Sequence, residues 1–290
     1  MFDPKTNKFP YTENTDGHYL VVKKDNGNVY DENFPYIDKS FRFKFVRFWA
    51  RVVIVLIVFP MTYLRLGLKI KGKKYLKKNK VLLKKGAISV SNHIHMWDFL
   101  GVMSIVHHIR WPNILVWEKN MSGESAGAVK VVGGIPIPSH NMRGFAKFAR
   151  TTIDHVKNGA WLHVCAEGSM WEYYAPIRPF KDGAAYFAYK SDKPLIPMAY
   201  SYREVGWIRK HIFRQIAKLT LNIGEPLFID KSLPQDKAIE KLTIEAHEKV
   251  CELAGFKKGE NIYPPLYNKD SSKRIDYYTK EYGVNYKKSR

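Results

Sequence analysis

The stretch AISVSNHIHMWDFLGVMSIVH, residues 87–107, decides the fold class. It opens with an apolar run of strand length, Ala87–Ser91, and continues into a helical pattern from Met96 to His107. A polar turn that contains His93 separates the two. The same order of strand, helix and strand recurs downstream, which predicts an α/β fold with a largely parallel central sheet flanked by helices.

The remaining elements follow from the same alternation of short apolar runs and amphipathic stretches. Strands are expected at Ile114–Trp117, Val131–Ile137, Trp161–Cys165, Pro194–Tyr200 and Leu219–Ile223, and helices at Met142–Lys157 and Gln235–Ala254. We expect this α/β domain to span residues 86–256. Residues 1–40 are expected to form a polar tail or a small hairpin turning at Asn26 and Gly27, and residues 257–290 a basic tail.

Composition places the chain among folded proteins that bind something anionic. Hydrophobic residues make up 45% of the 290 residues and aromatic residues 14%, so a sizeable core can form. The 48 Lys and Arg against 27 Asp and Glu give a net charge of +21, which suits nucleic acid, an anionic membrane or an acidic partner. The two cysteines, Cys165 and Cys251, indicate neither a disulfide framework nor a zinc site. The N-terminus shows no secretory signal pattern, so a cytoplasmic location is expected.

Residues 41–85 have the character of a membrane-surface helical segment. Val52–Leu64 is an apolar run of about 13 residues, shorter than the roughly 20 that a spanning helix needs. Lys44, Arg47 and Arg51 precede it at helical spacing among aromatic residues, which predicts one basic and one aromatic face. Ten Lys or Arg and no acidic residue follow in residues 65–85. An interfacial anchor on anionic lipid is the favoured interpretation, and a core helix with a solvated basic edge is the alternative.

The residues with the strongest catalytic potential are His93 and Asp98. His93 follows a predicted strand, and functional groups collect at the carboxyl ends of strands in open α/β sheets. An aspartate five positions later, on the first turn of the next helix, can hold one imidazole nitrogen as a donor and leave the other to accept a proton. Glu167 follows another predicted strand, so it is expected at the same sheet edge, although a helix N-terminal carboxylate would look the same.

Taken together, four blocks in this order resemble the lysophospholipid and 1-acylglycerol-3-phosphate acyltransferase family, which carries an Asn-His motif followed by four residues and Asp. The matching blocks are Asn92-His93 to Asp98, Val132 to Ile137, Glu167-Gly168-Ser169 and Pro194 to Pro197. The resemblance covers roughly residues 86–200. It implies that His93 is the general base on an acceptor hydroxyl, that Asp98 orients it, and that the hydroxyl attacks an acyl thioester without a covalent acyl-enzyme.

The resemblance also implies the substrates and the cell surface on which they meet. The acceptor is expected to be a lysoglycerophospholipid, and the co-substrate acyl-CoA or an acylated, acidic carrier protein. No bound cofactor and no metal are implied, and Asn92, Gly168 and Ser169 join Glu167 as substrate-binding residues. The expected location is the cytoplasmic face of the cell membrane, as a peripheral or monotopic protein.

Two family arginines that hold the acceptor phosphate have no counterpart in this sequence. Ser139 and Met170 stand at those positions. Arg143, Arg178 and Lys181 lie close enough in sequence to replace them. We therefore expect 1-acylglycerol 3-phosphate as acceptor, with these three residues near its phosphate.

Two other function classes fit parts of the sequence. Gly123 to Gly127 has the G-x-S-x-G pattern of a serine esterase with Ser125 as nucleophile, but the apolar run before it ends at Trp117, so no strand leads into an elbow. A nucleic-acid-binding protein would suit the sequence pI of about 9.7. No zinc-finger, ribonucleoprotein or zipper motif supports it, so no nucleic-acid partner is expected.

Overall fold

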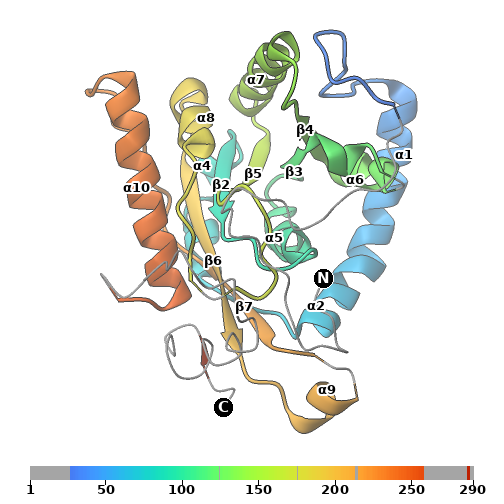
Figure 1. The fold of residues 1–290 in the computed structure, drawn as a ribbon, viewed down its shortest axis with the longest axis vertical. Helices are drawn as coiled ribbons and strands as arrows, with labels where there is room; N and C mark the ends of the chain where they lie inside the picture. Colours follow the sequence, from blue (N-terminus) through green and yellow to red (C-terminus); the bar gives the residue numbers. More distant parts are fainter. Residues whose placement is uncertain (1–26, 124, 175, 213–214, 258–285, 288–290) are drawn as a thin grey trace.

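A computed structural model describes residues 27–257 and 286–287, apart from residues 124, 175, 213 and 214 (Figure 1). The strands are β1 (Lys69–Lys71), β2 (Ala87–Ser91), β3 (Pro112–Trp117), β4 (Gly134–Ile137), β5 (Trp161–Cys165), β6 (Leu195–Arg203), β7 (Lys218–Ile223) and β8 (Tyr286–Lys287). The α-helices are α1 (Phe41–Val53), α2 (Phe59–Leu66), α3 (Lys73–Lys78), α4 (Lys80–Leu83), α5 (Asp98–Val106), α6 (Ala126–Val132), α7 (Met142–Lys157), α8 (Gly183–Ser191), α9 (Trp207–His211) and α10 (Gln235–Ala254). A π-helix, η1 (Ile54–Val58), joins α1 to α2, and a 3-10 helix, η2 (Glu118–Met121), follows β3.

The central sheet confirms the predicted fold class. Its strand order is β1-β7-β6-β2-β5-β3-β4, with β8 pairing beside β6. Among the described strands, β6 and β7 are the one antiparallel pair, and the others run parallel. Parallel strands need both faces of the sheet covered, which explains their almost uninterrupted apolar sequences.

The order of the strands decides which face each helix covers. The connection from β2 through α5 to β3 moves along the sheet in one direction, whereas those through α7 and α8 move in the other. Because such crossovers are right-handed, α5 must lie on the opposite face from α7 and α8. The contacts agree, since α10 packs on α8 and β6, while α2 packs on α5. The sheet therefore forms the middle of three layers (Figure 1).

The N-terminal helical segment is longer than the apolar run alone suggested. The helices α1, η1 and α2 form one helix of 26 residues, Phe41–Leu66, which is long and apolar enough to cross a membrane. The helix is therefore about twice as long as the predicted apolar run of 13 residues, because the aromatic turns before Val52 belong to the same helix. Only 17% of its most apolar stretch of 18 residues is buried, so it is not a core helix.

The orientation of this helix also differs from the expectation. Two of its three predicted basic residues face the protein, whereas Lys44 is exposed: Arg47 donates to Asn113 Oδ1 at 3.3 Å, and the Arg51 guanidinium lies 4.7 Å from the centre of the Trp111 ring. Most of its exposed side chains are apolar. The exposed large apolar residues are Phe41, Phe45, Val46, Phe48, Trp49, Val53, Leu56, Ile57, Met61 and Leu64.

Two smaller expectations are changed by the structure. The predicted strand Val131–Ile137 is split, because α6 continues to Val132 and β4 begins at Gly134. Gly133 makes the turn with φ of 128°, and a Cβ there would lie 2.7 Å from the carbonyl oxygen of Pro112. The predicted N-terminal hairpin lies largely outside the described residues, as does most of the C-terminal tail. Residues 27–40 have no strand and pack on the domain through buried Tyr30 and Tyr36.

The register of β2 and β5 sets up the functional edge of the sheet. Ser91, the last residue of β2, pairs with Cys165, the last residue of β5. The residues two positions further on are His93 and Glu167. The two catalytic candidates therefore leave the sheet side by side, as their strand-end positions predicted.

Candidate active site

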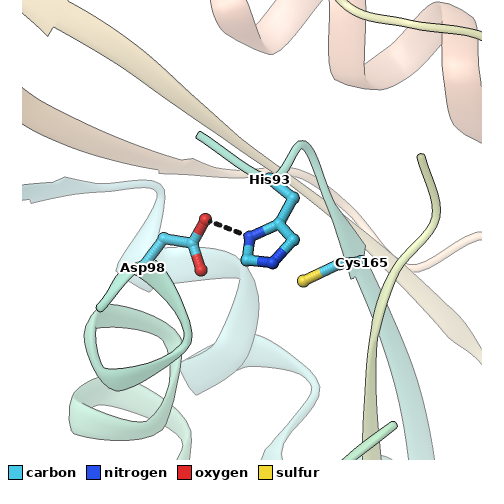
Figure 2. A group of neighbouring side chains, drawn as sticks. All are labelled: His93, Asp98 and Cys165. Atoms are coloured by element: carbon cyan, nitrogen blue, oxygen red, sulfur yellow. Dashed lines mark hydrogen bonds and ion pairs between the residues drawn. The ribbon is translucent and has the colours of Figure 1, made fainter. Parts of the chain in front are cut away.

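His93 and Asp98 are hydrogen-bonded at the carboxyl edge of β2. The imidazole Nδ1 lies 2.7 Å from Asp98 Oδ2 (Figure 2). The same carboxylate oxygen accepts the backbone N–H groups of Ile94 at 2.9 Å and His95 at 3.2 Å, as expected of an acidic residue that opens helix α5. Asp98 is almost wholly buried, whereas the His93 side chain is 23% exposed. A neutral His93 that donates through Nδ1 can accept a proton at Nε2.

The electrostatics of the pair favour an ion pair between the two residues. Burial disfavours a charged imidazole, but the negative charge and hydrogen bond of Asp98 outweigh it and raise the pKa of His93 well above its ordinary value. Burial likewise works against the Asp98 carboxylate, yet His93 and the backbone donors lower its pKa. Asp98 therefore stays ionised and holds the imidazole in place.

Asn92 anchors the turn from which His93 projects. Its side chain accepts the backbone N–H of Tyr200 at 2.8 Å and donates to the Tyr200 carbonyl at 3.1 Å. This two-way contact continues the pairing of β2 with β6 by one residue beyond the strand. Asn92 is 1% exposed, so in this structure its amide positions His93 rather than facing a substrate.

Glu167 connects the two strand ends through its two oxygens. Oε2 accepts the backbone N–H of His93 at 3.0 Å, and Oε1 accepts that of Arg178 at 2.9 Å. The Arg178 guanidinium adds a 3.2 Å ion pair with Oε2 and donates to Ser169 Oγ at 2.9 Å. It also lies 4.7 Å from the centre of the Trp171 ring. With only 2% of its surface exposed, Arg178 is an internal partner of Glu167.

The other predicted phosphate-binding residues have different surroundings. Lys181 is exposed, and its stem packs on Gly168, where an added Cβ would lie 2.8 Å from Lys181 Cε. Gly168 has φ of 80°, which suits glycine. Arg143 projects from α7, with 86% of its side chain exposed, toward Glu32 at 3.6 Å. No contact joins it to His93 or Glu167 in the part of the chain that the structure describes.

Cys165 is the residue of this site that was not singled out from the sequence. Its Sγ, the His93 ring and the Asp98 carboxylate offer atoms that all lie within 4.8 Å of one another. The signal was its position as the last residue of a strand beside β2. These three residue types are also zinc ligands, so the group could hold a metal ion. The expectation that no metal is used stays a prediction.

Behind the site, His163 is buried on β5. Its Nδ1 lies 3.0 Å from Ser89 Oγ, and burial lowers its pKa to about 4. An unfolded histidine has a pKa of about 6.5, so below that pH the unfolded chain binds a proton that the folded protein excludes. The contribution of His163 therefore destabilises the fold as the pH drops from 6.5 to 4.

We expect this residue to remove roughly 3 kcal/mol of the free energy of unfolding between pH 7 and pH 4. Urea unfolding at a series of pH values would measure it. A His163→Gln variant keeps a polar group beside Ser89 but cannot be protonated, so its stability should vary less with pH over this range. Parallel profiles for the two proteins would contradict the assignment.

The alternative nucleophile Ser125 has no supporting geometry. It precedes α6, and η2 and a turn separate it from β3, so no strand leads directly to it. A nucleophile elbow requires that strand.

Comparison with known families agrees with the motifs. Residues 67–201 match the family described as Acyltransferase, and this segment contains His93, Asp98 and Glu167. The chain thus contains a segment of 135 residues that is similar to the acyltransferase family. Among solved structures it is similar to the 1-acyl-sn-glycerophosphate (LPA) acyltransferase PlsC from Thermotoga maritima, with a TM-score of 0.48 and 16% identity over 75% of this chain and 85% of that one. No curated protein matches the sequence.

Proposed function

We propose that the protein transfers a fatty acyl group from an acyl thioester to the free hydroxyl of a lysoglycerophospholipid. The supporting observation is the 2.7 Å contact between His93 and Asp98 at the sheet edge, within the acyltransferase-family segment. It leaves one imidazole nitrogen as a base for the acceptor hydroxyl. The preferred acceptor is 1-acylglycerol 3-phosphate, and the product is then phosphatidic acid.

The residues divide the reaction between them. His93 takes the hydroxyl proton as the acceptor oxygen forms its bond to the acyl carbonyl carbon. The carbon–sulfur bond of the thioester then breaks, and His93 returns the proton to the leaving thiol. Asp98 stabilises the imidazolium that exists between these steps. Glu167 accepts the backbone N–H of His93, which supports the loop that carries the base.

Lys181 is the residue that we assign to the acceptor phosphate. A phosphate leaving water needs charge-assisted donors. Arg178 has its guanidinium directed at Glu167 and Ser169, whereas Lys181 is exposed and its stem lies against Gly168 in the same block. The backbone N–H of Lys181 donates to the Ala166 carbonyl at 2.8 Å, which fixes the start of its side chain beside the site.

The direct test is to incubate the purified protein with a panel of lysolipids and labelled acyl donors and to identify the products by mass. We expect phosphatidic acid to form fastest. Lys181→Ala should raise KM for 1-acylglycerol 3-phosphate about tenfold, equivalent to about 1.4 kcal/mol, and leave slow transfer to monoacylglycerol unchanged. Lys237→Ala removes a similarly exposed lysine from α10 and is the control. Equal KM values for both variants would remove Lys181 from the phosphate site, and a preference for lysophosphatidylcholine would overturn the acceptor.

The donor is acyl-CoA or an acylated carrier protein. Both are anionic, and the net charge of +21 attracts either one. The panel separates them when each carries the same acyl chain.

We further propose that the protein works at the cytoplasmic face of the membrane, held by residues 41–85 without crossing it. The apolar side of the helix Phe41–Leu66 is exposed, and all ten Lys and Arg of residues 65–85 are exposed as well. An apolar surface next to a cluster of cations suits an interfacial anchor on anionic lipid.

Ile57→Glu should weaken binding to anionic vesicles by about tenfold or more, because a carboxylate replaces an apolar side chain at the lipid contact. Ile244→Glu is a matched control, since Ile57 and Ile244 are each 53% exposed and Ile244 lies on α10. High salt should weaken binding of the wild type without abolishing it, because apolar burial persists when charges are screened. Vesicle flotation measures both effects. Protease protection that places residues 40 and 90 on opposite sides of the bilayer would contradict surface binding.

A further inference from the structure

The strands β6 and β7 extend past the carboxyl edge of the sheet. β2 pairs with β6 only as far as Pro197, whereas β6 continues to Arg203 and stays paired with β7 over that length. The end of β6 and the start of β7 therefore lie beyond the edge at which His93 leaves β2. The short helix α9 lies in the connection between these two strands, at the end of the molecule to which β6 points (Figure 1).

The side chains on α9 form an exposed apolar surface. Trp207, Ile208 and Ile212 are each at least 59% exposed. Ile208 and Ile212 are four positions apart, so they share one face of the helix, and Trp207 stands beside it. Lys210 and His211 are exposed next to them. Large apolar side chains that gather on a surface mark a contact with a partner, and tryptophan beside cationic groups is typical of a membrane interface.

Helix α9 is held against the end of α2. Arg209 of α9 donates to the Leu64 carbonyl at 2.8 Å. Arg203, at the end of β6, donates to the carbonyl of Gly67, the residue that ends α2. Because the Leu64 side chain is itself exposed, the apolar surfaces of α9 and of the N-terminal helix lie close together.

Positive charge collects at the same place. Residues 203–218 contain five Lys or Arg and one acidic residue, Glu204. The hydrogen-bond partners of Arg203 and Arg209 are neutral, namely backbone carbonyls, a threonine hydroxyl and a glutamine amide oxygen. Burial and, after it, the positive charge of Arg209 lower the pKa of Arg203, and Lys218 is affected in the same direction. Anions such as phosphate groups would offset this repulsion.

We propose that α9 is a second membrane contact, which binds anionic phospholipid beside the N-terminal helix and turns the carboxyl edge of the sheet toward the bilayer. This inference rests on the proposed function, which places the protein at a membrane. A single helix lying on a membrane leaves the domain free to rotate about the helix axis. A contact on a different element, beyond the edge that carries His93, removes that freedom.

The end of α2 connects this surface to the candidate active site. Burial has the largest effect on the pKa of His95 and of Tyr173, and the positive charge of Arg65 on α2 also acts on both. His95 is two residues from His93, and Arg65 is exposed. The lipid surface at α9 and at the end of α2 therefore begins near the site, which gives an acceptor in the bilayer a short path to His93.

The contact can be measured without any acyl transfer, by quenching of tryptophan fluorescence. Full-length protein is mixed with vesicles of phosphatidylglycerol and phosphatidylcholine whose acyl chains carry bromine, and with unbrominated vesicles as the control. Trp207 on α9 and Trp49 on the N-terminal helix are both exposed. We expect Trp207→Phe and Trp49→Phe each to remove part of the quenching.

The quenching results separate the two contacts. If Trp49→Phe reduces the quenching and Trp207→Phe does not, α9 is not a lipid contact and the N-terminal helix remains the anchor. If brominated vesicles do not quench the wild type at all, the membrane location fails together with this inference. A dimer in solution that Ile208→Glu dissociates, without quenching of Trp207, would assign the surface to a second copy of the chain.

The orienting role is tested by activity at the vesicle surface. At a vesicle concentration at which flotation shows all proteins bound, Ile208→Glu should lower the rate of transfer to 1-acylglycerol 3-phosphate in the vesicles about tenfold, because the site is no longer held toward the lipid. Ile244→Glu, at a similarly exposed position on α10, should leave the rate unchanged. Thermal unfolding shows that both variants are folded. An unchanged rate for bound Ile208→Glu would overturn the orienting role, whereas a wild type that binds through Trp207 but transfers no acyl group would overturn only the proposed function.

Discussion

Replacing His93 by alanine should lower kcat by about 10²–10⁴ while the protein stays folded. The loss follows because no other base of the described site has a nitrogen held by Asp98 and open toward the sheet edge. The variant should still fold because Asp98 continues to accept hydrogen bonds from the backbone N–H groups of Ile94 and His95. Product formation from labelled acyl donor measures kcat, and thermal unfolding measures stability. Near wild-type turnover in folded His93→Ala would exclude His93 as the base.

Two further measurements separate a base from a residue that only shapes the site. Asp98→Asn should also be severe, because the amide places a donor against Nδ1 and disturbs the tautomer. In the wild type, kcat/KM should rise with pH through the raised pKa of His93, since only the neutral imidazole accepts a proton. A profile that is flat from pH 6 upward would contradict that role.

Arg178→Ala should be the most destabilising single change at the site. It leaves the Glu167 carboxylate buried without its ion-pair partner, which typically costs 3–5 kcal/mol. The contact of the guanidinium with Trp171 is lost as well. Urea unfolding would show a lower free energy of unfolding, and acyl transfer should fall with it because Glu167 also supports the backbone of His93.

The surface residue Arg143 is the comparison for this change. Its side chain is 86% exposed and pairs with Glu32 at 3.6 Å, so Arg143→Ala should alter stability by no more than about 0.5 kcal/mol. Combining Arg178→Met with Glu167→Gln should recover part of the loss, since it removes the unpaired charge. Equal stability of the two alanine variants would show that the buried pair contributes nothing.

Much of the fold could be predicted because its signals are local. Short apolar runs of strand length predicted β2 and β5 closely, and two long amphipathic patterns predicted α7 and α10. The pair His93 and Asp98 was accessible for the same reason, because a strand, a turn and a helix start fix their relative positions within a few residues. The prediction that Glu167 lies near His93 needed one further inference, namely that the carboxyl ends of parallel strands lie at the same edge of the sheet.

The remaining features depend on contacts between distant segments. The course of residues 176–181 beside β5 decides whether the Arg178 side chain contacts solvent or Glu167. No local sequence pattern in this loop predicts that course. Cys165 became a candidate only when the register paired it with Ser91. The strand at Val131–Ile137 was mispredicted because valines suit both a helix end and a strand, and Gly133 separates the two elements.

The exposed apolar side of the helix Phe41–Leu66 also determines the conditions under which this protein can be studied. Ten large apolar side chains on that helix face water in the isolated molecule. An exposed apolar surface of this kind favours binding of detergent or association with a second copy of the protein. Particle size and recovered activity will then depend on which amphiphile is supplied and how much. Rates should accordingly be compared at a fixed ratio of amphiphile to protein, with the acceptor expressed as its share of the lipid surface.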